Sequence, residues 1–176
     1  MKFFILINFL FIFFAGCTNK LPKPGSDNIE SLLIIPQKAI NQTKAPFGFK
    51  YIFTLKTEDG MEKIIELYPN TSREYYIFDS LSPGTYKFES RQDCLNVRGR
   101  TRSNCRPRKA KPIKFTLSSN SITILSQGFR VKQIWKNNMN SINARFESVP
   151  KKIEQKILEE LKSLENYEKW EIKSKT

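Results

Sequence analysis

The chain has 176 residues, a formal net charge of +13 at pH 7, three cysteines and no histidine. The lack of histidine removes the commonest general base and the commonest zinc ligand, so it excludes histidine-dependent catalysis and histidine-bound metal centres. So high a positive charge predicts either an anionic partner or protection against self-association. The length suits one domain with its own core.

The first nineteen residues have the pattern of a secretory signal peptide. Lys2 precedes an apolar run from Phe3 to Phe14, and the small residues Ala15 and Gly16 follow it. Such a run is too short and wrongly flanked for a membrane-spanning helix. We therefore expect residues 1–16 to be removed during export.

The residues Phe14-Ala15-Gly16-Cys17 resemble the lipobox of bacterial lipoproteins, although Phe14 stands where that family usually has leucine. The resemblance covers only the signal region. It implies that the thiol of Cys17 is acylated, that the peptide is cut just before Cys17, and that the lipid holds the protein on a membrane. An ordinary cleaved signal or an N-terminal hydrophobic anchor is the alternative.

Thr18 bears on which membrane is used. In enterobacterial lipoproteins an aspartate after the acylated cysteine retains the protein at the inner membrane, and Thr18 takes that place here. By resemblance we expect the outer membrane, facing the periplasm. Residues 17–30 are polar, contain Pro22, Pro24 and Gly25, and lack apolar periodicity, which predicts a flexible tether.

Residues 31–147 predict a β-sandwich domain. The clearest signal is the alternation of apolar and polar residues from Phe47 to Lys56, which has the period of a strand. Glu58-Asp59-Gly60 then predicts a hairpin turn. Further short β-rich runs are Leu32–Ile35, which Pro36 should end, and Met61–Leu67, Tyr75–Phe78, Ile113–Leu117, Ile122–Ile124, Phe129–Val131 and Ala144–Glu147. About seven short strands with turns between them predict a mainly β fold, an antiparallel sandwich.

The segment Leu81-Ser82-Pro83-Gly84-Thr85-Tyr86 predicts a tight turn. Pro83 presets φ for a type II turn and Gly84 accepts the positive φ, so Leu81 and Tyr86 should point into the core. The segment resembles the Leu-x-Pro-Gly-x-Tyr turn of transthyretin-like and carboxypeptidase-regulatory-like domains. That resemblance implies a seven-stranded sandwich of a kind that binds or supports and is seldom catalytic. A well-made β-turn without family meaning is the alternative.

Residues 148–170 predict an amphipathic helix, with Ser148 as its cap and Pro150 in its first turn. Its apolar stripe consists of Ile153, Ile157, Leu161 and Leu164. The stripe either packs on the sandwich as a lid or docks a protein partner, as an accessory subunit of an envelope or secretion complex would. Residues 171–176 are expected to be a tail.

The segment from residue 91 to residue 114 is strongly basic. Nine cations face the single acid Asp93: Arg91, Arg98, Arg100, Arg102, Arg106, Arg108, Lys109, Lys111 and Lys114. Cys94 and Cys105 are the pair left once Cys17 carries lipid, and in an exported protein they predict one disulfide. The segment is either a disulfide-closed loop that binds anions through arginine or a solvated charge run at a hairpin tip.

The anion is not expected to be nucleic acid, because residues 91–111 contain no aromatic side chain on which bases could stack. A phosphorylated glycolipid, an acidic wall polymer, phospholipid headgroups or an acidic protein surface suit an exported protein better. Neither metal nor cofactor is expected, and the chain carries no motif of an enzyme. The sequence predicts a non-enzymatic binding or assembly component of the cell envelope.

The lipidation hypothesis is directly testable. Cys17→Ser should leave an unprocessed or soluble protein, because no thiol remains to be acylated. Detergent partitioning and mass spectrometry of the mature N-terminus measure this. A wild-type protein whose mature chain begins at a residue other than Cys17 would contradict the hypothesis.

Overall fold

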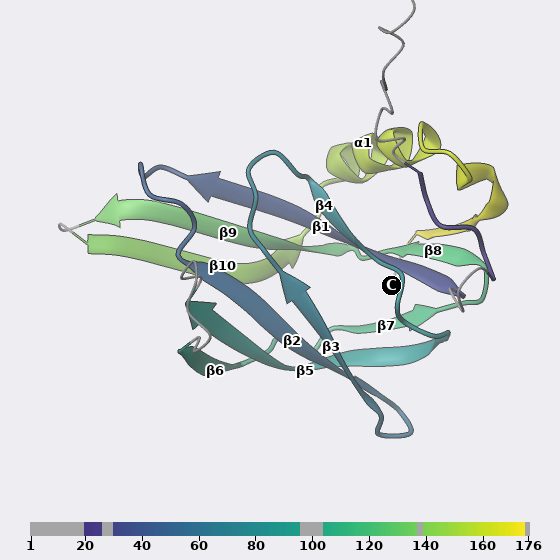
Figure 1. Ribbon diagram of the computed structural model, residues 1–176, viewed down its shortest axis with the longest axis horizontal. Coiled ribbons are helices and arrows are strands. Elements are labelled where there is room, and N and C mark those ends of the chain that lie inside the picture. Colours follow the sequence, from purple (N-terminus) through teal and green to yellow (C-terminus); the bar gives the residue numbers. More distant parts are fainter. Residues whose placement is uncertain (1–19, 26–29, 96–103, 137–138, 175–176) are drawn as a thin grey trace, which may run out of the picture.

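The computed structural model describes residues 20–25, 30–95, 104–136 and 139–174. Two β-sheets pack face to face, and one α-helix lies on the outer side of one sheet (Figure 1). In this part of the chain no helix is long and apolar enough to cross a membrane. The mainly β sandwich with a C-terminal helix that the sequence predicts is confirmed.

The six-stranded sheet has the order β10-β9-β1-β8-β11, with β4 paired to β1. Its strands are β1 (Ser31–Asn41), β4 (Tyr75–Phe78), β8 (Ser121–Ile124), β9 (Gln127–Lys136), β10 (Met139–Ser148) and β11 (Glu171–Ser174). The five-stranded sheet has the order β3-β2-β5-β6, with β7 paired to β5. Its strands are β2 (Phe49–Thr57), β3 (Glu62–Leu67), β5 (Gly84–Leu95), β6 (Cys105–Lys109) and β7 (Lys114–Leu117).

The six-stranded sheet is mixed rather than antiparallel throughout. β1 runs parallel to both β8 and β9, and β11 runs parallel to β8. The chain enters β8 by crossing from β7 in the other sheet, and such a crossover, unlike a hairpin, allows parallel pairing. The described residues hold eleven strands, more than the seven or so expected, because three strands formed where none was expected: β5 after the Pro83-Gly84 turn, β6 in the basic segment and β11 in the tail.

Strand β1 is buried on both faces. Leu33 and Ile35 face the core between the sheets, whereas Leu32 and Ile34 face the helix, and all four are fully buried. Burial on both faces explains why this strand is a continuous apolar run instead of an alternating one.

Pro36 was expected to end the first strand, but β1 continues to Asn41. β1 pairs with β8 up to Ile34 and with β9 from Gln37 onward, so Pro36 stands between two ladders. A residue without an N–H is tolerated at such a junction. Gly128 lies against it, and a Cβ there would come within 2.9 Å of the Pro36 carbonyl oxygen. The close approach of these two strands therefore requires glycine.

Aromatic rings fill the core between the sheets. Phe53 lies at its centre, with ring centroids 5.4 Å from Phe88 and 5.3 Å from Phe129. Leu81 and Tyr86 both point into this core, as the turn motif predicts. The Tyr86 hydroxyl donates to the Ser82 carbonyl, 2.8 Å away, which fixes the turn to its own strand. Gly84 has φ of +152°, so its φ is positive but more extended than a type II turn requires.

The helix buries its apolar stripe within the chain. Helix α1 (Lys151–Lys162) places Ile157 and Leu161, both fully buried, in a second core. The other side of that core is formed by Leu21, Leu32, Ile34, Ile122, Ile124 and Trp170. Of the two roles expected for the apolar stripe, packing on the sandwich as a lid is the one that the structure shows.

The helix is shorter than the expected 148–170. Ser148 ends β10 and makes no cap, Pro150 takes the N-cap position, and the helix ends at Lys162. Asn166 then adopts the left-handed conformation with φ of +68°, and the 3₁₀ helix η2 (Tyr167–Lys169) follows. This reversal returns Trp170 to the sheet. Most of the expected tail 171–176 is strand β11 instead.

The described part of the expected tether is docked rather than free. Leu21 is buried, and its N–H donates to the Glu165 carbonyl at 3.0 Å. The Asn166 side-chain amide donates to the Leu21 carbonyl at 2.9 Å, and the Trp170 indole N–H donates to the Pro22 carbonyl at 2.9 Å. Polar composition alone gave no sign of these bonds, because backbone groups and one leucine make the contact.

The lid predicts a large effect of truncating its central residue. Leu161→Ala should lower the free energy of unfolding by about 2–5 kcal/mol, because it opens a cavity in a closed apolar core. Glu159→Ala, on the exposed face of the same helix, should change it by less than about 0.5 kcal/mol. Urea denaturation of both variants measures the difference, and equal small effects would show that α1 does not stay on the sheet in solution.

Candidate functional site: a cationic end of the sandwich

The basic segment folds into a β-hairpin instead of an open loop. β5 and β6 pair in register from Ser90↔Lys109 to Cys94↔Cys105. Cys94 and Cys105 are directly opposite residues, with Cα atoms 4.0 Å apart, and they form the disulfide that the sequence predicts. Three of the five residues of β6 are charged and one is proline, so the strand lacked the apolar alternation by which other strands were recognised.

A β-bulge in β5 decides which way the charges point. Leu55 of β2 pairs with Phe88, but Thr54 pairs with Ser90, so Glu89 is an extra residue. An extra residue shifts the alternation of side chains by one. Before the bulge Phe88 faces the core, and after it Arg91 and Asp93 take the inward positions opposite Phe53 and Tyr51.

Arg91 is therefore a structural residue. Its Nε lies 2.8 Å from Asp93 Oδ1, and its Nη1 donates to the Ala144 carbonyl of β10 at 2.8 Å. Its guanidinium lies 5.7 Å from the centre of the Tyr51 ring, and both charged side chains are only 16% exposed. Burial, assisted by the Asp93 carboxylate, raises the pKa of the Tyr51 phenol, so that ring remains neutral beside the ion pair.

The other predicted anion-binding residues divide into three groups. Arg106, Arg108 and Lys109 are exposed on β6, with Arg108 Nε 3.6 Å from Asp93 Oδ2. Lys111 and Lys114 are exposed farther along the chain, and Lys111 Nζ donates to the Gln127 side chain at 2.8 Å. Cys17 and the arginines of the hairpin tip lie outside the described residues, namely Arg98, Arg100 and Arg102.

Two other segments reach the same end of the molecule. The connection between β1 and β2 and the ends of β9 and β10 lie toward the same extremity of the long axis as the β5–β6 hairpin, and the ends of β9 and β10 extend beyond it (Figure 1). Gln133 of β9 ties the connection down: its side chain donates to Thr43 Oγ1 at 2.9 Å and to the Pro46 carbonyl at 3.1 Å, and accepts from the Gly48 N–H at 3.1 Å.

These segments add cations that sequence reasoning did not connect with the hairpin. We call the following exposed or half-exposed residues the cationic end: Lys44, Arg106, Arg108, Lys132 and Lys136. In residues 41–50, 91–95, 104–109 and 132–145 the only acid is Asp93, and its carboxylate is already paired with the Arg91 guanidinium. Residues 130–145 contain no acid at all, and that bias was visible in the sequence.

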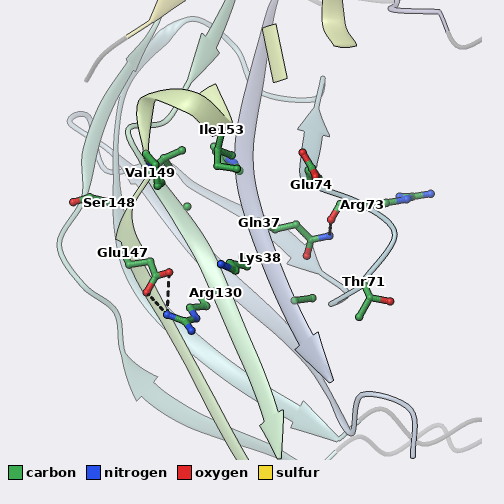
Figure 2. Close-up of a pocket in the computed structure, with 14 residues that line it drawn as sticks. Gln37, Lys38, Thr71, Arg73, Glu74, Arg130, Glu147, Ser148, Val149 and Ile153 are labelled. Atoms are coloured by element: carbon green, nitrogen blue, oxygen red, sulfur yellow. Dashed lines mark hydrogen bonds and ion pairs between the residues drawn. The ribbon is translucent and has the colours of Figure 1, made fainter. Parts of the chain in front are cut away.

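A cavity of about 260 Å³ lies elsewhere, on the outer face of the six-stranded sheet beside the start of α1. Figure 2 shows Arg130 and Glu147 pointing toward one another across one wall, with a separation of 3.2 Å. On another wall Glu74 pairs with Lys156 at 2.5 Å. Both acids of its lining are paired, whereas Lys38 and Arg73 also line the cavity, which lies apart from the β5–β6 hairpin to which the sequence assigns the anion site. Within the described ranges no cluster of three or more cysteine, aspartate or glutamate residues could hold a metal ion.

Comparison of the chain with known protein families, with curated proteins and with solved structures found no match.

The buried Arg91–Asp93 pair predicts that two acids of β5 contribute differently to the stability of the protein. Asp93→Asn should lower the free energy of unfolding by about 1–3 kcal/mol, because two guanidinium groups lose the carboxylate between them. Glu89→Gln breaks the exposed Lys87–Glu89 pair and should cost less than about 0.5 kcal/mol. Thermal and urea melts of both variants provide the measurement, and an Asp93→Asn protein as stable as wild type would refute a structural role for the pair.

Proposed function

We propose that this protein is an exported, lipid-anchored component of a bacterial cell envelope that binds an anionic partner without catalysis. The observation that carries the proposal is the cationic end, where three chain segments carry Lys44, Arg106, Lys132 and Lys136 toward one extremity of the molecule and the only acid of those segments, Asp93, is paired with Arg91. The lipobox resemblance at Cys17 supports the anchor, and Thr18 supports the outer membrane.

The construction of this end favours binding. Arg106 and Arg108 stand on a strand that is held by a full ladder and a disulfide, so little backbone freedom remains to be lost when a ligand binds. Guanidinium groups match phosphate and carboxylate oxygens in pairs, which gives arginine an advantage over lysine at such sites. Arg106, Lys132 and Lys136 form no ion pair with any residue that the structure describes.

Docking of a protein partner through residues 150–170 is not part of this proposal. The stripe that would make the contact is buried against the sheet and against Leu21. A partner could reach it only after α1 left the sheet, at the cost of exposing two apolar surfaces.

A matched pair of charge reversals tests the proposal. The first variant carries Arg106→Glu, Lys132→Glu and Lys136→Glu at the cationic end. The second carries Lys56→Glu, Lys63→Glu and Lys152→Glu, which are exposed elsewhere and change the net charge equally. Binding to vesicles that contain phosphatidylglycerol, and to soluble polyphosphate, is measured from low to physiological salt.

We expect the first variant to lose most of its binding to at least one probe and the second to lose much less. Wild-type binding should weaken as salt rises, since the Debye length shrinks to about 8 Å at physiological strength. Melting temperatures should stay close together, because these side chains are exposed. Equal losses in the two variants would mean that only the overall charge matters.

A further inference from the structure

The β9–β10 hairpin exposes large apolar side chains at the cationic end. Trp135 is 61% exposed and Met139 is 67% exposed, whereas the chain's other tryptophan, Trp170, is only 5% exposed. Leu95, the last described residue of β5 before the hairpin tip, is 38% exposed. Two large exposed apolar side chains at the end of one hairpin, next to exposed lysines, are suited to contact with an amphipathic surface.

We propose that the anionic partner is the surface of a lipid bilayer, into which Trp135 and Met139 insert. This inference rests on the cationic end of the proposed function and names its ligand. Lys136 lies between the two apolar residues along the chain, and Lys132 lies four residues earlier on the same face of the strand. The long side chains of these lysines can extend to the lipid phosphates while Trp135 and Met139 enter the headgroup region.

The register of the hairpin favours a lipid surface over a protein. Met139 pairs directly with Lys136, so Met139 and Lys136 share one face of the hairpin, and Trp135 points to the opposite face. A partner packed on either face would cover only one of the two apolar residues. Immersion of the hairpin end covers both at once. Tryptophan also suits the headgroup region, because its ring is apolar and its indole N–H can find a polar acceptor there.

A soluble polyanion accounts for the lysines but not for the apolar pair. Phosphate or carboxylate groups on a polymer would be satisfied by Lys132, Lys136 and Arg106 alone. No acid occurs between residue 130 and residue 146, so nothing repels an anionic membrane from this hairpin. The end of β9 and β10 also lies at an extremity of the molecule, where it can meet a flat surface (Figure 1).

Tryptophan fluorescence separates the two ligands. The test uses the mature chain with Cys17→Ser, which carries no lipid of its own and keeps every contact described above. It is mixed with vesicles of equal parts phosphatidylcholine and phosphatidylglycerol, with pure phosphatidylcholine vesicles, and with soluble polyphosphate. A further Trp135→Phe substitution leaves Trp170 as the only tryptophan and identifies the origin of any shift.

We expect emission to move to shorter wavelength with the anionic vesicles, not with polyphosphate, and not in the Trp135→Phe protein. Trp135→Ala with Met139→Ser should weaken vesicle binding on the order of tenfold and leave polyphosphate binding unchanged. Met61→Ser with Ile64→Ser is the matched control, because these residues are similarly exposed on the β2–β3 hairpin and should have no effect.

Other outcomes would overturn the inference in distinguishable ways. Vesicle binding without a Trp135 shift, or equal binding by the Trp135/Met139 variant, would overturn insertion while leaving the anion-binding proposal in place. An equal shift with polyphosphate would replace the bilayer by a soluble polymer. Failure to bind either anionic probe would overturn both proposals and leave a protein as the partner.

Discussion

The structure depends on the burial of β1 from both sides. Its alternate residues Leu33 and Ile35 close the aromatic core, while Leu32 and Ile34 receive the helix. A strand used on both faces can hold three layers together, and it pairs with β4, β8 and β9 along its length. Helix α1, the C-terminal strand and the N-terminal segment are all stabilised by the outer face of this one strand and its neighbour β8.

That arrangement also separates the charges. The lid covers only the half of the six-stranded sheet where β1 pairs with β8, and the acids of the helical region lie with it, including Glu154, Glu159 and Glu160. The other half carries the hairpins and keeps the cations. Residues 148–174 contain as many acidic as basic side chains, so the net positive charge of the protein lies in the rest of the chain.

The sequence predicted those elements whose side chains alternate. The strand pair β2 and β3 and its turn at Gly60 were recognisable, because one face of each strand is apolar and the other polar. β6 was not, since a disulfide and ladder bonds hold it rather than apolar burial. Arg91 faces inward because the extra residue Glu89 shifts the strand register by one. Composition alone does not reveal such a shift. The disulfide was predictable because only two cysteines remained. Convergence of distant segments on one end required the fold.

Docking of residues 20–22 against Glu165, Asn166 and Trp170 changes what a lipid at Cys17 would do. Cys17 and Lys20 are three residues apart, so their Cα atoms can be separated by at most about 11 Å. So short a connection would hold the side of the sandwich that carries α1 close to the anchoring bilayer and would restrict how the sandwich can tilt. If the cationic end bound the same bilayer, contact at both extremities would lay the long axis parallel to the membrane. If it bound a second bilayer, the protein would span the space between the two membranes.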